Sequence, residues 1–367
     1  MDSITHLAFG AALGHLVAGR RLGRRALALG ALAATVPDFD NIVLFGGDAF
    51  AEWHHHRGFT HSVFFGLVLG LVLGWLFWRH ANRVRPYEPD GADDALPVWI
   101  ALFLACLLTH PLLDVFTVYG TQLLAPFSGM RFAISGIAII DPFYTLPLIG
   151  AALAAIARPD TAFARGLGLL ALAFSAIWQL YGTAQNMRVE RMARDQLAAE
   201  GVALADVRVY TTIFQPWLRR IVVDEPAGAR VAFASPLQKG AVAWTCFVRP
   251  AHPAFAELAA TPQGRLLDWF ASGETWPALA ADGTRARLTD RRYGAPGATA
   301  QGWWGIEAPL DAAGQVAQTP TRLSIPRPLD WPTVRALYAA AFGRPGPLFP
   351  QAADAASAAA TCAATRR

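Results

Sequence analysis

Histidine and acidic side chains in the first 145 residues offer the groups that bind metal ions. Four of the nine histidines fall within eight residues, in the segment HHHRGFTH that ends at His61. Gly58 disfavours one helix through both His56 and His61, so we expect His56 on a loop and His61 in the first turn of the next helix. Both imidazoles could then point into one pocket. A run of surface histidines, or a ring of polar residues where a helix leaves a membrane, would have the same sequence.

Further candidate side chains stand near the ends of apolar runs. His110 and Asp114 are four apart, the spacing that puts two side chains on one helical face. Pro111 predicts a kink between them, across which the pair could simply bond to each other. Asp38 and Asp40 follow a proline, so they either contribute carboxylates to a site or only form a turn.

Imidazole and carboxylate groups together indicate a hydrolytic metal site. They suit zinc first, and also manganese or iron, whereas the three scattered cysteines form no CxxC pair for a structural zinc site. A bound metal lowers the pKa of water and polarises a phosphoryl or acyl oxygen, so no serine or cysteine nucleophile is needed. We expect one or two divalent ions. Their expected ligands are His6, Asp38, His56, His61, His110 and Asp114.

Three further residues are the expected catalytic groups. Asp40 and Asp141 are predicted to act as general bases, or else as ligands or as hydrogen-bond partners of a ligand histidine. Arg57 stands between two expected ligands and could hold an anionic group such as a phosphate. The alternative for Arg57 is an arginine that snorkels to a membrane interface.

The elements that carry these residues are strongly apolar. The chain has 367 residues, of which 54% are hydrophobic and 16% charged, which is too apolar for an ordinary soluble enzyme. Because the apolar runs end near Tyr181, we predict a multi-pass α-helical membrane bundle at 1–182 followed by a soluble α+β domain at 183–350. The alanine-rich tail at 351–367 is expected to be disordered. A soluble bundle of unusually apolar helices is the alternative.

Six apolar runs approach the ~20 residues that a helix needs to cross a bilayer. They are residues 4–19, 26–45, 60–78, 96–116, 137–157 and 165–182. Arginines concentrate in the loops that would share one side, which the positive-inside rule makes cytoplasmic. All the candidate histidines and aspartates then lie at the outer face, where ionisable groups usually mark a function. The net charge of +4 is explained by these arginines, so no nucleic-acid partner is indicated.

Glycines four residues apart indicate close helix packing. They occur in the first run and, at Gly66, Gly70 and Gly74, in the third, so we expect these two helices in the interior of the bundle. In the soluble part, alternation predicts strands, and an amphipathic run at 253–271 predicts one helix. The expected strands are 207–214, 219–223, 230–233 and 302–306. No glycine-rich phosphate loop and no nucleophile elbow occurs there.

In combination, these motifs resemble the family of bacterial inner-membrane metal-dependent hydrolases. The segments that carry the resemblance are Met1–His6, Pro37–Asp40, the HRGFTHS segment His56–Ser62, Thr109–Asp114, Tyr119–Gln122 and Ile140–Pro142. They cover about the first 145 residues, whereas Pro216–Arg219 resembles a family segment less sharply. The pair His110 and Asp114 is also similar to a helix pair in the zinc site of bacterial phospholipase C. The resemblance implies a bacterial inner-membrane location and a hydrolytic activity.

The sequence therefore predicts a membrane-bound metal-dependent hydrolase that cleaves an ester or phosphoester by metal-activated water. Its site and C-terminal domain are expected on the extracytoplasmic face. A site at the outer bilayer boundary meets lipid head groups most readily, so the expected partners are the lipid bilayer and an amphiphilic or lipid-linked substrate. The alternative is a non-catalytic membrane protein with a structural metal and a partner-binding or regulatory soluble domain. An ion transporter is disfavoured because the expected cytoplasmic ends are poor in histidine and aspartate.

Overall fold

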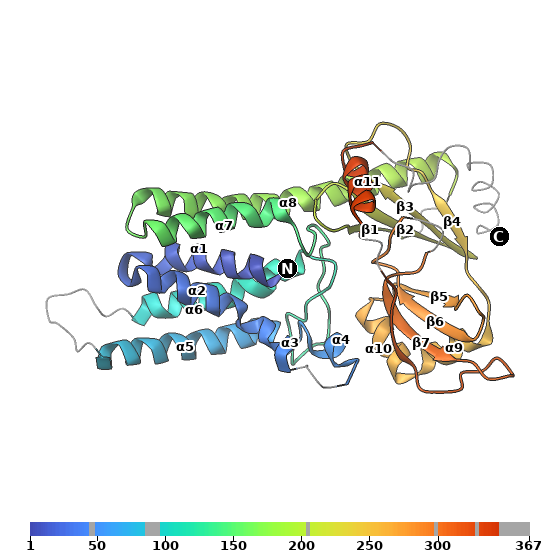
Figure 1. The fold of residues 1–367 in the computed structure, drawn as a ribbon, viewed down its shortest axis with the longest axis horizontal. Coiled ribbons are helices and arrows are strands. Elements are labelled where there is room, and N and C mark those ends of the chain that lie inside the picture. The colour runs from blue at the N-terminus through green and yellow to red at the C-terminus, as the bar shows by residue number, and fades with distance from the viewer. Residues whose placement is uncertain (44–47, 85–95, 203–205, 297–299, 327–329, 345–367) are drawn as a thin grey trace. The chain divides into compact units, whose positions relative to one another are not determined.

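The chain forms two compact units, shown in Figure 1. This computed structural model describes residues 1–43, 48–84, 96–202, 206–296, 300–326 and 330–344. The first unit holds Met1–Gly47 and His55–Tyr181, and the second holds Asp48–His54 and the chain from Gly182 onward. The tail at 351–367, expected to be disordered, lies outside the described residues.

The first unit is helical. Its elements are α1 (Ser3–Leu22), α2 (Arg24–Thr35), the 3-10 helix η1 (Val36–Phe39), α3 (Asp40–Val43), the 3-10 helix η2 (Phe59–His61), α5 (Val63–Val84), α6 (Leu96–Val115), α7 (Pro142–Ala157) and the first half of α8 (Ala162–Ala199). The short helix α4 (Ala51–His55) lies across the boundary of the two units. The longer helices run side by side (Figure 1).

Three helices in the described part of the chain are long and apolar enough to cross a membrane. They are Val63–Arg83, Leu96–Val115 and Ala162–Ala199, while Pro142–Ala157 is a shorter apolar helix. The expected run at 26–45 is broken, because Pro37 lies in η1 and α2 has already ended at Thr35. The run at 137–157 becomes helical only at Pro142, after the cap residue Asp141.

Glycines allow two helix pairs to pack closely. A Cβ atom added to Gly10 of α1 would lie 2.4 Å from the carbonyl oxygen of Gly30 in α2, and one added to Gly70 of α5 would lie 3.1 Å from the Cα atom of Leu104 in α6. The expectation that α5 lies in the interior is wrong, because only 17% of its apolar window is buried. Its glycines form one face against α6, while residues such as Val68, 61% exposed, point outward.

The second unit contains two antiparallel sheets, which confirms the predicted soluble α+β domain after a helical membrane part. One sheet has the order β1 (Val207–Thr211), β2 (Arg219–Glu225), β3 (Gly228–Ala234), β4 (Thr245–Val248). The other has the order β5 (Thr275–Leu279), β6 (Arg285–Asp290), β7 (Trp304–Pro309), β8 (Thr321–Ser324). Three helices complete it: α9 (Pro253–Ala260), α10 (Pro262–Phe270) and α11 (Trp331–Ala341).

The C-terminal half of α8 supplies part of the core of this unit. Val189, Ala193 and Leu197 recur at helical spacing and pack against the first sheet, where Ile221 and Val223 are fully buried. The single helix expected at 253–271 is two helices. The Thr261 hydroxyl caps the second one by accepting a hydrogen bond from the Gly264 amide, and Pro262 follows at its first position.

Candidate metal centre

The expected site residues gather at one end of the first unit. Helix α1 begins there and α2 ends there, while α5 begins and α6 ends at the same place (Figure 1). Because these helices run in opposite directions, the start of one helix and the end of its neighbour lie at the same end of the unit. Residues far apart in the sequence therefore come together there. His6 is in the first turn of α1, and Asp38 follows α2. His61 ends the 3-10 helix η2 and so lies before α5 rather than in its first turn, while His110 and Asp114 are in the last turns of α6.

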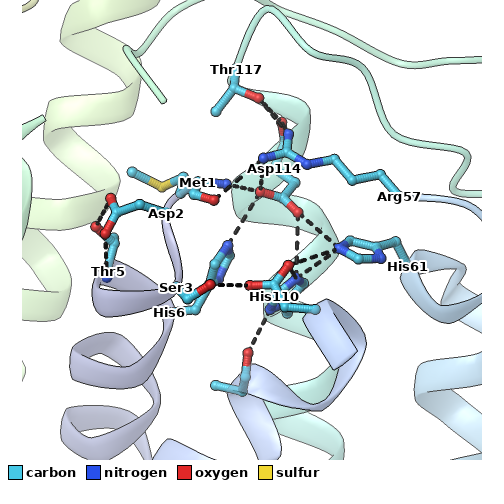
Figure 2. Close-up of polar contacts among 12 residues, drawn as sticks. Met1, Asp2, Ser3, Thr5, His6, Arg57, His61, His110, Asp114 and Thr117 are labelled. Carbon is cyan, nitrogen blue, oxygen red and sulfur yellow. Dashed lines mark hydrogen bonds and ion pairs between the residues drawn. The ribbon is translucent and has the colours of Figure 1, made fainter. Parts of the chain in front are cut away.

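Five of the six expected ligands form two overlapping groups. His6, Asp38 and His110 make one group, and His61, His110 and Asp114 make the other. Within each group the candidate ligand atoms all lie within 4.8 Å of one another. The four side chains other than Asp38 are fully buried, and Figure 2 shows them turned toward one another. Among the described residues these are the two groups whose spacing suits a metal ion.

Hydrogen bonds fix the orientation of the two central imidazoles. The Nδ1 atom of His110 lies 2.5 Å from the carbonyl oxygen of Ala34, and a carbonyl only accepts, so Nδ1 carries the proton. The Nδ1 atom of His61 lies 3.0 Å from the Thr60 hydroxyl and 3.4 Å from Asp40 Oδ2. Because the Thr60 hydroxyl donates to Asp40 over 2.9 Å, it accepts from His61 Nδ1. A neutral ring in this orientation presents an unprotonated Nε2 atom to the cluster.

The two Nε2 atoms and two carboxylates face one another. His61 Nε2 and His110 Nε2 are 3.0 Å apart, and each lies 3.4 Å from Asp114 Oδ2. Asp38 Oδ1 lies 3.5 Å from His61 Nε2 and 3.6 Å from His110 Nε2. With the tautomers above, four electron-pair donors converge. Such a set requires a cation or an extra proton to be stable.

His56, an expected ligand, lies outside both groups. Its Nδ1 atom is 2.8 Å from Asp40 Oδ1, and its ring contacts the His61 ring edge-on at 5.6 Å. Burial by itself raises the pKa of the Asp40 carboxyl, but hydrogen bonds from His56 and His61 lower it well below its usual range. Asp40 is therefore a carboxylate that orients two histidines, which is one of the roles expected from the sequence.

Arg57 is buried and paired with the cluster. Its backbone is left-handed, with φ 59°, and its side chain is 3% exposed. The guanidinium lies 3.1 Å from Asp114 Oδ1 and donates to the Thr117 hydroxyl over 2.7 Å (Figure 2). The Met1 amine contacts the same Asp114 oxygen. Arg57 was expected to hold an anionic group of a substrate, whereas here it neutralises a candidate ligand.

Asp141, the third expected catalytic residue, caps helix α7. Its Oδ1 atom accepts hydrogen bonds from the backbone amides of Phe143 and Tyr144, at 3.0 and 3.3 Å. Its Oδ2 atom accepts from the indole of Trp178 at 2.9 Å. Asp141 belongs to neither metal-type group of the described residues. These contacts give its carboxylate a structural role.

Several groups around the cluster could not be found from the sequence. The Ser3 hydroxyl donates to Asp38 Oδ2 over 3.1 Å, and Thr117 and Thr60 bond to Arg57 and Asp40. Ser3 and Thr60 lie close in the sequence to the expected ligands His6 and His61, which was a weak signal that they contribute to the site. No signal marks the carbonyl of Ala34, because any residue offers one.

Comparisons with known proteins concern mainly the helical part. Residues 1–186 match the model of a family described as YdjM inner membrane protein. The protein YfhP of Bacillus subtilis is 29% identical over 212 residues, which are 54% of this chain and 59% of that relative, so the chain spans less than two thirds of it. Inner membrane protein YbcI of Escherichia coli is 32% identical over 133 residues, 35% of this chain and 69% of that relative. No solved structure matches.

Proposed function

As a member of the YdjM inner membrane protein family, this chain is an inner-membrane protein, and we propose that it is a metal-dependent hydrolase. The proposed substrate is an ester or phosphoester of a lipid or lipid-linked molecule. The proposed metal is zinc, with manganese or iron as alternatives, bound by His61, His110, Asp38 and Asp114.

One observation carries the metal assignment. A tetrahedral zinc site with bonds of about 2.0–2.1 Å has about 3.3–3.4 Å between neighbouring ligand atoms. The five separations given above among His61 Nε2, His110 Nε2, Asp38 Oδ1 and Asp114 Oδ2 are 3.0, 3.4, 3.4, 3.5 and 3.6 Å. These five separations are close to those between ligands around one small cation, while Asp38 and Asp114 belong to different groups of candidate ligands.

His6 offers an alternative position for an ion. The two positions share His110, whose Nδ1 atom donates to Ala34 and whose Nε2 atom has one lone pair, so one ion at a time can use this ring. The Nε2 atom of His6 lies 3.2 Å from Asp114 Oδ1, and the His6 ring stacks on His110 with centroids 3.7 Å apart. His6, Asp38 and His110 form the second group of suitable atoms. The Nδ1 atom of His6 is buried and has no hydrogen-bond partner among the described residues.

The chain's own residues would prepare the site for hydrolysis. A bound divalent ion supplies a nucleophilic water and polarises the scissile oxygen. Asp40 and Ala34 hold His61 and His110 in the tautomers that direct Nε2 inward. Arg57 occupies Asp114 Oδ1, which leaves Oδ2 facing the two imidazoles. The His56 side chain is 13% exposed and is hydrogen-bonded to Asp40, so it is the group placed to exchange a proton with solvent.

The extracytoplasmic orientation of the site and of the C-terminal domain is part of this proposal. It is supported by the arginines at 20–25, around the turn from α1 to α2, and by Arg158 after α7, which lie at the other ends of the helices from the cluster. An alkaline phosphatase fused after the last residue would be active in this orientation. A fluorescent protein that matures only in the cytoplasm would be active in the opposite one.

A structural metal site is the second candidate. Four protein ligands and nearly complete burial are typical of structural zinc, whereas catalytic zinc keeps an open position. His61, His110 and Asp114 are at most 1% exposed, which favours this alternative. The Asp38 side chain, 10% exposed, is the part of the set that an incoming substrate would reach first.

The test measures metal and hydrolysis in the same preparations. Purified full-length protein is analysed for bound metals, together with His61→Ala, Asp114→Ala and the control His80→Ala, whose imidazole is exposed near the far end of α5. We expect metal in the wild type and the control, and loss of it in the other two. Hydrolysis of phospholipid vesicles should follow metal content. Unchanged metal in both cluster variants would end the proposal, and bound metal without hydrolysis would establish the structural alternative.

A further inference from the structure

The connection between α6 and α7 is a folded hairpin loop, and its base bonds to the candidate metal centre. Thr121 and Phe132 exchange backbone hydrogen bonds of 3.0 and 2.9 Å across the hairpin. The backbone amide of Gln122 donates a hydrogen bond to the backbone carbonyl of Arg57 over 2.9 Å. The base of the loop therefore shares hydrogen bonds with the segment that leads to His61.

The tip of this hairpin, residues 124–130, exposes apolar side chains. Leu124 is 39% exposed, Phe127 is 78% exposed and Met130 is 59% exposed. The tip sequence LAPFSGM contains no charged residue. An uncharged, ordered loop that exposes three large apolar side chains is rare on a surface that meets only water.

The tip continues the outward surface of a candidate membrane span. The Phe127 ring packs edge-on against Phe64 in the first turn of α5, with centroids 4.9 Å apart. The Val63 amide donates to the Leu123 carbonyl over 3.0 Å, which ties the loop to the start of the same helix. Leu67, Val68 and Leu71 continue the exposed apolar side of α5 beyond Phe64. Because α5 is a candidate membrane span with an exposed apolar side, lipid is the occupant that fits the adjoining tip.

We propose that residues 124–130 are a bilayer anchor, whose Leu124, Phe127 and Met130 side chains enter the acyl-chain region of the leaflet at which α5 begins. The anchor places lipids of that leaflet beside the hairpin whose base bonds to Arg57. It follows that the substrate is taken laterally from the membrane rather than from solution. This last step rests on the proposed hydrolase function, whereas the anchor itself does not.

Photo-crosslinking in a defined bilayer tests the anchor. Full-length protein carrying p-benzoylphenylalanine at one position is placed in nanodiscs of phosphatidylethanolamine and phosphatidylglycerol and illuminated. Position 127 is the test, position 71 within α5 is the reference for lipid contact, and position 331 in α11 is the control, because Trp331 is 74% exposed in the second unit. Intact-mass spectrometry measures phospholipid adducts.

We expect phospholipid adducts at positions 127 and 71 and none at 331. Absence of an adduct at 127 while 71 reacts would refute the anchor, and so would a covalent dimer at 127, which would show that a second copy of the chain covers the tip. Absence of metal from the wild-type protein, together with a phospholipid adduct at position 127 of the labelled protein, would refute the proposed hydrolase and leave the anchor standing.

The lateral route is tested with Phe127→Lys in metal-loaded protein. We expect loss of hydrolysis on phospholipid vesicles and unchanged hydrolysis of a soluble short-chain ester or phosphoester. Equal loss on both substrates, or no loss on vesicles, would refute the lateral route. Metal content is measured in the same preparation and should be unchanged, because Phe127 is 78% exposed and its ring contact among the described residues is with Phe64.

Discussion

The Nε2 atoms of His61 and His110 lie 3.0 Å apart, and the Nδ1 atom of each ring is hydrogen-bonded to an oxygen of the chain. Neutral rings in these tautomers direct two lone pairs at each other, which is unfavourable unless a cation or a proton lies between them. The carboxylate oxygens of Asp38 and Asp114 near the same atoms strengthen this requirement. We interpret the cluster as a metal centre, and not as a hydrogen-bonded core, because of this close approach of the two Nε2 atoms.

Asp40→Asn should weaken metal binding without abolishing it. The amide keeps the volume of the carboxylate but loses the charge that favours a proton on His61 Nδ1, 3.4 Å away. Loss of such an orienting partner typically costs about 10–100-fold in metal affinity. Competition with a chromophoric chelator measures the change. Asp160→Asn, at an exposed turn, is the matched control, and an affinity equal to that of the control would remove Asp40 from the site.

Gly10→Ala should destabilise the first unit by about 1–3 kcal/mol through overpacking. The added Cβ would lie 2.4 Å from both the Gly30 carbonyl oxygen and the Cβ atom of Ala34. Since the Ala34 carbonyl orients His110, metal affinity should fall as well. Gly150→Ala in α7 is the control, because its Cβ would meet no atom within 4 Å. Thermal unfolding in detergent should separate the two, and equal melting temperatures would contradict the close packing.

Trp53→Ala should destabilise the second unit by about 3–5 kcal/mol, the usual range for a buried tryptophan. Trp53 is 1% exposed, stacks on Phe270 at 5.4 Å and lies 5.1 Å below the Arg322 guanidinium. Glu52 forms an ion pair with the same arginine at 2.6 Å. Limited proteolysis of the second unit measures the loss. Trp331→Ala removes a 74% exposed side chain and should change little, so a similar effect of both substitutions would argue against the Trp53 contact.

Asp224 should make the second unit sensitive to acid. Burial alone raises the pKa of the Asp224 carboxyl, but two 2.6 Å hydrogen bonds from Arg291 lower it below the usual value. A lowered pKa in the folded state contributes stability above the unfolded-state pKa of about 3.9, and this contribution is lost as the pH falls through the folded-state value.

Melting temperatures measured from about pH 6 down to about pH 3 check this sign, since the window brackets the ordinary aspartate pKa. Asp224→Asn should be less stable than wild type at pH 6 and should lose less stability on acidification. Identical slopes for the two proteins would show that other carboxyl groups carry the acid response.

Much of the architecture follows from local patterns in the sequence. The apolar runs predict membrane helices, the alternation from Val207 onward predicts strands, and the arrangement of helix ends predicts that His6, Asp38, His61, His110 and Asp114 lie at one end of the bundle. These predictions depend on periodicity and on chain connectivity, which neighbouring residues already fix.

The sequence failed where contacts between distant residues decide the outcome. Asp40 was expected to be a general base, a ligand or a hydrogen-bond partner of a ligand histidine, and only packing shows that it bonds to His56 and His61. Nothing near Trp53 in the sequence indicates that its segment belongs with the sheets of the second unit.

By itself, the sequence determined that a membrane bundle precedes an α+β domain and which residues could bind metal, because residue type and spacing are local properties. Only the tertiary structure decided which atoms face one another. Arg57 meets Asp114 across 57 residues and His110 meets the Ala34 carbonyl across 76. Such pairings are set by how closely helices approach and by which oxygen lies within hydrogen-bond reach of a ring nitrogen, and both depend on the packing of the whole unit.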